Sequence, residues 1–247
     1  MRRSVLPLAL ALGAAAACTP RAVTPPTRTF ALDSPHAPTT GASDVQVGGT
    51  RIGTIWGPEL WSGDTRVRHA VSDVAVVEAE AGLLHLSNEG SGDNRNALTG
   101  RVGLLVRPSD WETQEVRAAL VVGVGGGHSP AAGEWGAFDV GGMISSSHRW
   151  IRPVVSIGGG YSAPFGEQTF TVTEPDGTAT MLKLPRNVTA YVSAGLELGP
   201  RERTLLLGAS FMHFQLLERS EVVSDSTDDH PTDAFFGLGA AARFTLD

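Results

Sequence analysis

The sequence predicts an all-β fold: an eight-stranded antiparallel up-and-down β-barrel that crosses a membrane. Three observations lead to this prediction. Apolar and polar residues alternate with a period of two in eight segments, the polar face of these segments is mainly glycine, alanine, serine and threonine, and the connections between them alternate in length. A period of two is typical of β-strands, because successive side chains point to opposite faces of the sheet.

The chain begins with the features of a secretory signal peptide. Arg2 and Arg3 form a positively charged start, Val5–Leu12 is apolar, and small residues lead into Cys18. We expect residues 1–17 to be removed. A cysteine after small residues resembles the lipobox of bacterial lipoproteins, which implies that the Cys18 thiol is acylated, for example with palmitate. The alternative is an ordinary cleaved signal with an incidental cysteine, and no other cysteine exists to form a disulfide.

Two segments separate the signal from the expected barrel. Residues 18–44 are rich in proline and lack apolar periodicity, so we expect a lipid-anchored tether. Residues 45–73 have no single interpretation. They could pack in the periplasm, enter the barrel lumen as a plug, or add two strands to make a ten-stranded barrel, since one extra strand would break the even strand count of bacterial barrels.

The barrel domain is expected over residues 74–247. In "NVTAYVSAGLEL", for example, Val188, Val192 and Leu196 share one face, while Thr189 and Ser193 share the other. Each segment is long enough to cross a bilayer as a tilted strand, which takes about 9–11 residues. The eight expected strands cover residues 74–86, 97–107, 115–127, 134–146, 150–162, 187–198, 203–217 and 234–246.

Two kinds of barrel are compatible with this alternation, and they are inside-out relative to each other. A soluble lipocalin-like barrel has apolar residues inside and charged residues outside, whereas a membrane barrel has an apolar exterior. The small polar residues of this chain suit a narrow lumen better than a water-facing surface. The chain also contains a single lysine, Lys183, although lysine is common on soluble exteriors. The membrane barrel is therefore favoured.

The connections and the charge support this interpretation. The last four of the seven gaps between the expected strands alternate clearly between shorter and longer, as periplasmic turns and outer loops do, while the first three discriminate only weakly. If the longer gaps are outer loops and the shorter gaps are periplasmic turns, both ends of the barrel lie on the periplasmic side, where we also expect the lipid-anchored N-terminus. With 26 acidic against 19 basic residues, the chain has no basic surface that would favour nucleic acid.

In architecture, the segment from 74 to 246 resembles the small eight-stranded outer-membrane barrels, the class that includes the OmpA transmembrane domain and OmpX. The final "GLGAAARFTLD" is similar to the C-terminal signal that the barrel-assembly machinery reads, with Phe244 near its end. The resemblance implies location in the outer membrane and contact with outer-membrane lipid, the barrel-assembly machinery and the lipoprotein-sorting machinery. It favours a non-enzymatic structural or surface-interaction role with a lumen plugged by side chains. The alternative is a periplasmic lipoprotein with a soluble barrel that binds an apolar ligand.

Alternation also predicts which charged residues face the lumen. We expect four acids and four arginines to form structural ion pairs there, because a charge in a narrow lumen is costly unless it is paired. If the first of eight strands closes against the last, Glu78 or Glu80 should meet Arg243. The predicted lumen residues are Glu78, Glu80, Arg101, Arg117, Asp139, Arg152, Glu197 and Arg243.

No catalytic, cofactor or metal site is expected. The glycine-rich runs at 123–129 and 157–161 lack the following helix that a phosphate-binding loop needs. The seven histidines show no ligand spacing. The acidic stretch 221–233 is expected to be a solvated loop or a weak divalent-cation site. A Pro-Asp-Gly turn predicts a protruding hairpin centred on 175–177.

Overall fold

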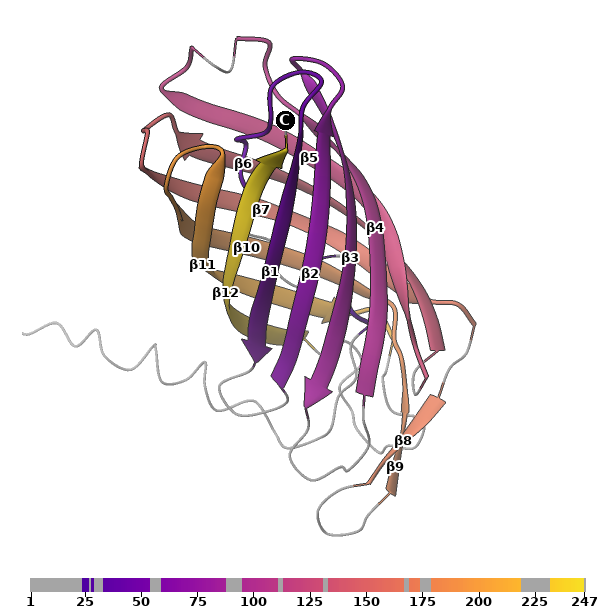
Figure 1. Cartoon of the computed structure of the whole chain (residues 1–247). Helices are drawn as coiled ribbons and strands as arrows, with labels where there is room; N and C mark the ends of the chain where they lie inside the picture. Colours follow the sequence, from indigo (N-terminus) through magenta and orange to yellow (C-terminus); the bar gives the residue numbers. More distant parts are fainter. Residues whose placement is uncertain are drawn as a thin grey trace, which may run out of the picture.

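A closed barrel of ten antiparallel strands dominates the structure, a computed structural model (Figure 1). It describes residues 24–26, 28, 33–53, 59–87, 95–110, 113–130, 133–166, 169–173, 179–218 and 232–246. The strands are β1 (Ser43–Gly53), β2 (Glu59–Ala70), β3 (Ala75–Ser87), β4 (Arg95–Val106), β5 (Val116–Ser129), β6 (Gly133–Ser146), β7 (Ile151–Pro164), β8 (Thr169–Thr173), β9 (Ala179–Lys183), β10 (Asn187–Leu198), β11 (Arg203–Leu216) and β12 (Thr232–Leu246).

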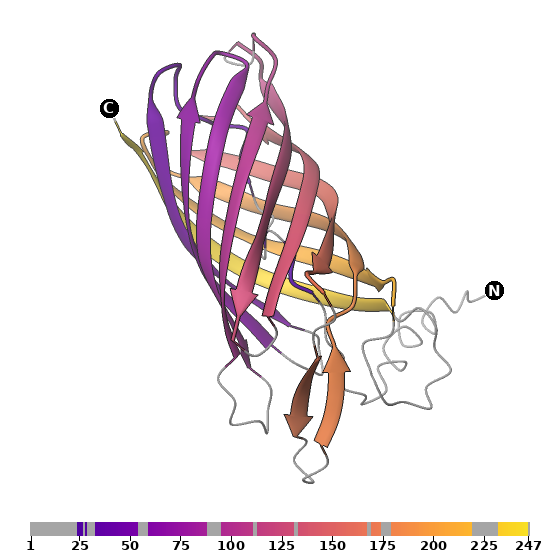
Figure 2. The same cartoon turned by 90° about the vertical axis from the view of Figure 1, so that its right-hand side faces the viewer.

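Each barrel strand pairs with its neighbours in the chain, and β1 pairs with β12 to close the wall. The closing register places Ser43 opposite Leu246. The remaining two strands, β8 and β9, pair with each other as a separate two-stranded sheet in the connection between β7 and β10. This hairpin projects away from the barrel wall, as the second view makes clear (Figure 2). The predicted hairpin is thus present, while its tip at 174–178 lies outside the described residues.

The two ends of the barrel differ. The end that carries Ser43 and Leu246 also carries the short turns 71–74, 147–150 and 199–202, and we call it the turn end. In the last of these turns, Gly199 has φ = 104°, which favours glycine. The opposite end, which we call the loop end, carries the β8–β9 hairpin and the long connection between β11 and β12.

All eight strands expected from alternation are present, with boundaries within two residues of those predicted. The barrel has ten strands, as in the alternative prediction, rather than eight. Residues 45–73 supply most of β1 and β2, so the barrel begins at Ser43 rather than at residue 74. These two strands have a weak alternation. On β2 only Trp61 and Val67 are apolar on the outward face, and on β1 the outward series ends in Gly49, Arg51 and Gly53.

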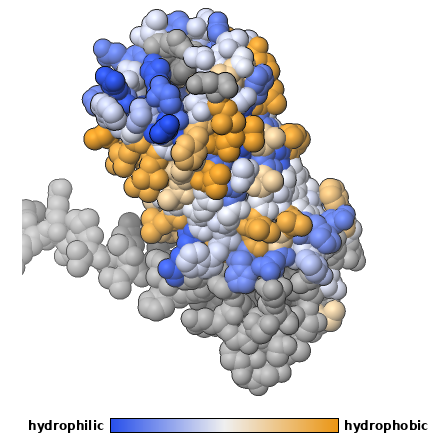
Figure 3. Space-filling view, in the orientation of Figure 1, coloured by the Kyte–Doolittle hydropathy of each residue, from blue (hydrophilic) through white to orange (hydrophobic). Residues whose placement is uncertain are grey.

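The outer face of the wall is apolar. Large apolar side chains project outward from all ten barrel strands, and Leu120 and Ile157 are more than 60% exposed. Among the described outward side chains of these strands, Asp, Glu, Lys and Arg occur only within two residues of a strand end, at Arg51, Glu134 and Arg203. In Figure 3 the apolar side chains cover the wall below the hydrophilic turn end.

The lumen is layered. Toward the loop end it holds an apolar cluster of Ile52, Met212, Phe214 and Phe235, in which the two phenylalanine rings meet edge to face. Toward the turn end it holds most of the buried charged side chains, together with a second apolar cluster of Ala70, Val76, Leu105, Ala119, Val121 and Met143. No helix among the described residues is long and apolar enough to span a bilayer.

Candidate functional site in the barrel lumen

All eight residues predicted to face the lumen lie on the inward face of the barrel. Seven are buried, and the side chain of Glu80 is about 10% exposed. They come from seven strands, and on each strand they share the inward parity, because successive side chains point to opposite faces. The structure gathers six of them into two ion-pair clusters, while Glu80 pairs with Arg66 and Arg117 contacts His36. The first is centred on Arg101 and the second on Glu197.

Arg101 bridges two carboxylates across the lumen. Its Nε and a terminal nitrogen lie 2.7 and 2.8 Å from the two carboxylate oxygens of Asp139, a bidentate arrangement that gives fixed geometry. Its other terminal nitrogen donates to Glu78 on the adjacent strand β3. Gly103 and Gly123 leave room for this side chain, since a Cβ at either position would overlap the guanidinium.

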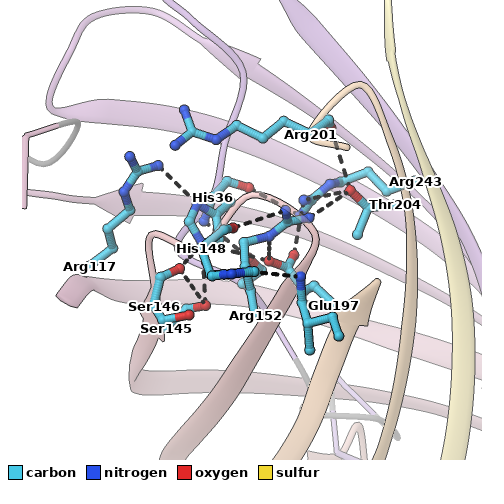
Figure 4. Close-up of polar contacts among 12 residues, drawn as sticks. His36, Arg117, Ser145, Ser146, His148, Arg152, Glu197, Arg201, Thr204 and Arg243 are labelled. Carbon is cyan, nitrogen blue, oxygen red and sulfur yellow. Dashed lines mark hydrogen bonds and ion pairs between the residues drawn. The ribbon is translucent and has the colours of Figure 1, made fainter. Parts of the chain in front are cut away.

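Glu197 is the centre of the second cluster, near the turn end (Figure 4). Its carboxylate oxygens lie 2.9 Å from Nε of Arg152 and 2.9 Å from a terminal nitrogen of Arg243. Arg152 also donates to the backbone carbonyls of Arg149 and Gly199, at 2.8 and 3.0 Å. These bonds tie the charged cluster to the turns between β6 and β7 and between β10 and β11.

The predicted contact between Glu78 or Glu80 and Arg243 is wrong. Because β1 and β2 stand between β3 and β12, the residue opposite Arg243 across the closing pair is Gln46. Arg243 binds Glu197 instead. The carboxylate of Glu80 accepts a hydrogen bond of 2.8 Å from Arg66 on β2, a residue that the eight-strand interpretation left outside the barrel.

The structure adds lumen residues that were not predicted. Arg66 and Arg68 project inward from β2, and Arg68 forms two hydrogen bonds of 2.9 and 2.6 Å with Asp44 on β1. The spacing "TRVRHA" puts two arginines on one face, a pattern that could have revealed them. Arg28, Asp33 and His36 come from the expected tether, where nothing in the sequence distinguishes a lumen residue.

The N-terminal segment therefore differs from the expected tether: its residues 33–38 lie in the lumen. Asp33 is about 1% exposed and lies 3.0 Å from Arg66, 2.9 Å from Arg28 and 3.7 Å from Arg68. Arg28 in turn donates to Glu78. A single buried carboxylate thus faces three arginines from two parts of the chain.

His36 lies in the lumen near the turn end and contacts residues of several strands (Figure 4). Its Nδ1 lies 3.1 Å from a terminal nitrogen of Arg117, which can only donate, so Nδ1 accepts and the proton resides on Nε2. Nε2 then donates to the carbonyl of Ser146, at 2.9 Å, and lies 3.2 Å from Oγ of Ser145. The carbonyl of His36 accepts from Arg68 and Arg243, at 2.9 and 3.1 Å.

This geometry does not fit acid–base catalysis. In a serine hydrolase the base needs a free ring nitrogen toward the hydroxyl and a carboxylate on the other nitrogen. Here the nitrogen near Ser145 carries the proton, and the other faces Arg117. Among the described residues, no group of three or more His, Cys, Asp or Glu side chains could hold a metal ion. The arrangement can neutralise charge and fill space.

Several predicted features lie outside the described residues. They are the signal peptide, Cys18 and the acidic stretch between 221 and 231.

Comparison with known proteins gives only distant likenesses in structure. No family model matches the chain, and no curated protein matches its sequence. Similar solved structures include the N-terminal β-barrel domain of Pseudomonas aeruginosa OprF (12% identity, TM-score 0.33, covering 83% of this chain and 98% of that one). Others are Ail, the attachment invasion locus protein of Yersinia pestis (13%, 0.34, 83% and 100%), and Neisserial surface protein A, NspA (10%, 0.34, 83% and 98%). The fold assignment rests on this chain's own strand pairing.

Proposed function

We propose that this protein is a β-barrel of the bacterial outer membrane with a closed lumen and a non-enzymatic structural or surface-interaction role. The observation that carries the proposal is the inside-out distribution of its side chains. The lumen holds the buried ions, and the outer wall holds the exposed leucine, isoleucine and valine side chains. A soluble barrel that binds an apolar ligand needs the reverse distribution, so the lipocalin-like alternative is not supported.

The wall also has the dimensions of a membrane barrel. Its strands are 11–15 residues long, and about 9–11 residues suffice to cross a bilayer at a tilt. Outward aromatic side chains lie toward both ends: Trp61 and Phe165 near the loop end, Trp150 and Phe244 near the turn end. Aromatic residues at the two interfaces are typical of outer-membrane barrels. The charge-free band between them would face the lipid.

The filled lumen supports a closed barrel rather than a pore. Apolar side chains occupy the part toward the loop end, and ion pairs, residues 33–38 and a second apolar cluster around Leu105 and Met143 occupy the part toward the turn end. The carboxylates of Glu78, Asp139 and Glu197 are all engaged by arginines, which supports a structural role for the charges. We therefore expect the protein to hold or present its loops without conducting solutes.

The orientation and the anchor are part of the proposal. The turn end carries three turns of four residues, and the loop end carries the two longest connections, 165–186 and 217–231. This difference supports loops that face outward from the cell and barrel ends that face the periplasm, although connection 107–115 at the turn end is longer than 130–132 at the loop end. The signal sequence ahead of Cys18 supports acylation of that residue. The barrel-assembly and lipoprotein-sorting machineries would then be its assembly partners, and outer-membrane lipid its surroundings.

Two measurements on the purified full-length chain test the proposal. Membrane barrels keep their fold in cold detergent, so the unboiled protein should migrate differently from the boiled protein on a gel. In planar bilayers, the protein that shows this shift should give no conductance steps. Recovery in the soluble periplasmic fraction without a heat-dependent shift would contradict the membrane barrel, and sustained steps would contradict the closed lumen.

A further inference from the structure

The described residues ahead of β1, which are 24–26, 28 and 33–42, contact the barrel at both of its ends. At the loop end, the hydroxyl of Thr24 donates a hydrogen bond of 2.6 Å to the carbonyl of Pro185, two residues before β10 begins, and Thr24 is fully buried. At the turn end, the amide of Gly41 donates to the carbonyl of Ala70, the last residue of β2, at 2.8 Å. These two contacts fix opposite ends of the segment.

Between these points, successive residues of the segment contact strand positions that lie progressively closer to the turn end. The carbonyl of Asp33 accepts from Ser156, the sixth residue of β7 from the turn end. Three residues later, His36 contacts Ser145, next to the turn-end limit of β6. The carbonyl of Pro38 accepts from Arg107, just beyond the end of β4, at 3.2 Å. Each step along the chain therefore lies closer to the turn end.

The length of the segment agrees with a single crossing. Seventeen residue steps separate Thr24 from Gly41, and a chain of that length extends to about 60 Å at most. A 14-residue strand such as β5 is about 46 Å long. The segment thus has enough chain to cross the barrel once.

We infer that the protein carries its N-terminus out of the barrel at the loop end, on the side opposite to its C-terminus. In an ordinary up-and-down barrel with an even strand count, the first strand starts where the last one ends, so both termini lie on one side. Here β1 and β12 do meet in that way, at Ser43 and Leu246. The described residues ahead of β1 place Thr24 at the loop end and Gly41 at the turn end, which reverses the side on which the preceding residues emerge.

The inference uses the proposed orientation only to decide which side is outside the cell. With the loops outward, the residues before Thr24 are presented at the cell surface. Cys18 is six residue steps from Thr24, within about 20 Å of chain. A lipid on Cys18 would therefore enter the outer leaflet, rather than the periplasmic leaflet that a tether outside the barrel would reach.

The arrangement also constrains assembly. The lumen around Asp33 and His36 is packed, and the β1–β12 pairing leaves no open edge. The segment must therefore lie in place before β1 pairs with β12, because a free or acylated end could not be drawn through afterwards. The buried ion pairs of Asp33 with arginines of β2 would hold it there during closure.

Single-cysteine additions with a membrane-impermeant maleimide test the inference in cells that express the full chain. Ala22→Cys reports on the N-terminal residues, Ser226→Cys on the long connection at the loop end, and Asp247→Cys on the C-terminus. Each variant must keep the heat-dependent gel shift of the folded barrel. The unsubstituted chain controls for the thiol of Cys18, which acylation would block.

We expect Ala22→Cys and Ser226→Cys to be labelled on intact cells, and Asp247→Cys only after permeabilisation. If Ala22→Cys and Asp247→Cys were labelled under the same condition and Ser226→Cys under the other, the two termini would lie on one side and the threading would be overturned. Labelling of Asp247→Cys alone on intact cells would overturn the proposed orientation and support the threading, because the other two positions would still share one side.

Discussion

Oδ1 of Asp33 lies 3.0 Å from a terminal nitrogen of Arg66, and each of the two side chains is about 2% exposed. One partner comes from a proline-rich segment and the other from the wall, so the contact joins the lumen contents to the barrel. Removing one partner of a buried ion pair costs about 3–5 kcal/mol, because the remaining charge stays buried and unpaired.

Asp33→Asn keeps the size of the side chain and removes its charge. We expect the free energy of unfolding to fall by about 3 kcal/mol or more, since three arginines lose their shared carboxylate. Guanidinium titration of the barrel in detergent, followed by the heat-dependent gel shift, measures the change. Asp110→Asn, in an exposed turn, is the matched control and should change stability by less than about 0.5 kcal/mol. Equal effects of the two substitutions would show that Asp33 is not held in the lumen.

A double-mutant cycle separates this contact from general damage. Arg66→Met alone should destabilise the barrel, but Arg66→Met combined with Asp33→Asn should cost less than the sum of the two. The expected coupling is about 1–3 kcal/mol, as for residues in one ion-pair network. Strict additivity would contradict the contact.

The strands could be predicted far better than the lumen contents. Eight of them show alternation because their outward faces are continuously apolar, for example Leu98, Val102, Leu104 and Val106 on β4. In β2 the outward face is apolar only at Trp61 and Val67. Its inward face carries Asp64, Arg66 and Arg68, so hydropathy alone does not mark it as a strand.

The even or odd position of each charged residue along its strand predicted that it points inward. It did not predict which residue it would pair with. Parity fixes the face of a strand and leaves the order of strands around the barrel open, so two additional strands were enough to separate Glu78 from Arg243. The burial of residues 33–38 in the lumen leaves no trace in local pattern. A segment in irregular conformation has no periodicity, and its burial depends only on what surrounds it.

Arg243 provides a second test of the charged lumen. Arg243→Ala removes an ion pair to Glu197 and a hydrogen bond to the carbonyl of His36, so we expect a loss of about 3–5 kcal/mol. Arg201 lies exposed in the turn between β10 and β11, and Arg201→Ala should leave the unfolding midpoint nearly unchanged. Chemical unfolding of both variants decides the matter. A comparable shift for the two arginines would contradict the ionic core.

Glycine at position 123 leaves space for the guanidinium of Arg101. Gly123→Ala places a methyl group against that guanidinium and should destabilise the barrel by about 1–3 kcal/mol, the usual cost of overpacking. Gly142→Ala is the control on the neighbouring strand, because its Cβ would meet only Leu120 at an ordinary 3.5 Å. If Gly142→Ala proved the more damaging, the inward position of Arg101 would be wrong.

Cys18 tests the anchor. Cys18→Ser should abolish incorporation of a palmitate analogue, because the chain contains no second cysteine that could be acylated in its place. Labelling of cells followed by isolation of the protein measures it. If the label persisted in the variant, it would contradict the proposal that Cys18 is acylated, but it would not bear on the barrel fold.

Tryptophan quenching tests the inside-out barrel most directly. Trp61 faces outward and is 47% exposed, whereas Trp135 faces inward and is 2% exposed. In lipid vesicles with brominated acyl chains, a variant that retains only Trp61 should lose most of its fluorescence, and one that retains only Trp135 should keep it. Stronger quenching of Trp135 than of Trp61, or no quenching of either in the folded, vesicle-bound protein, would contradict a barrel whose apolar wall faces lipid.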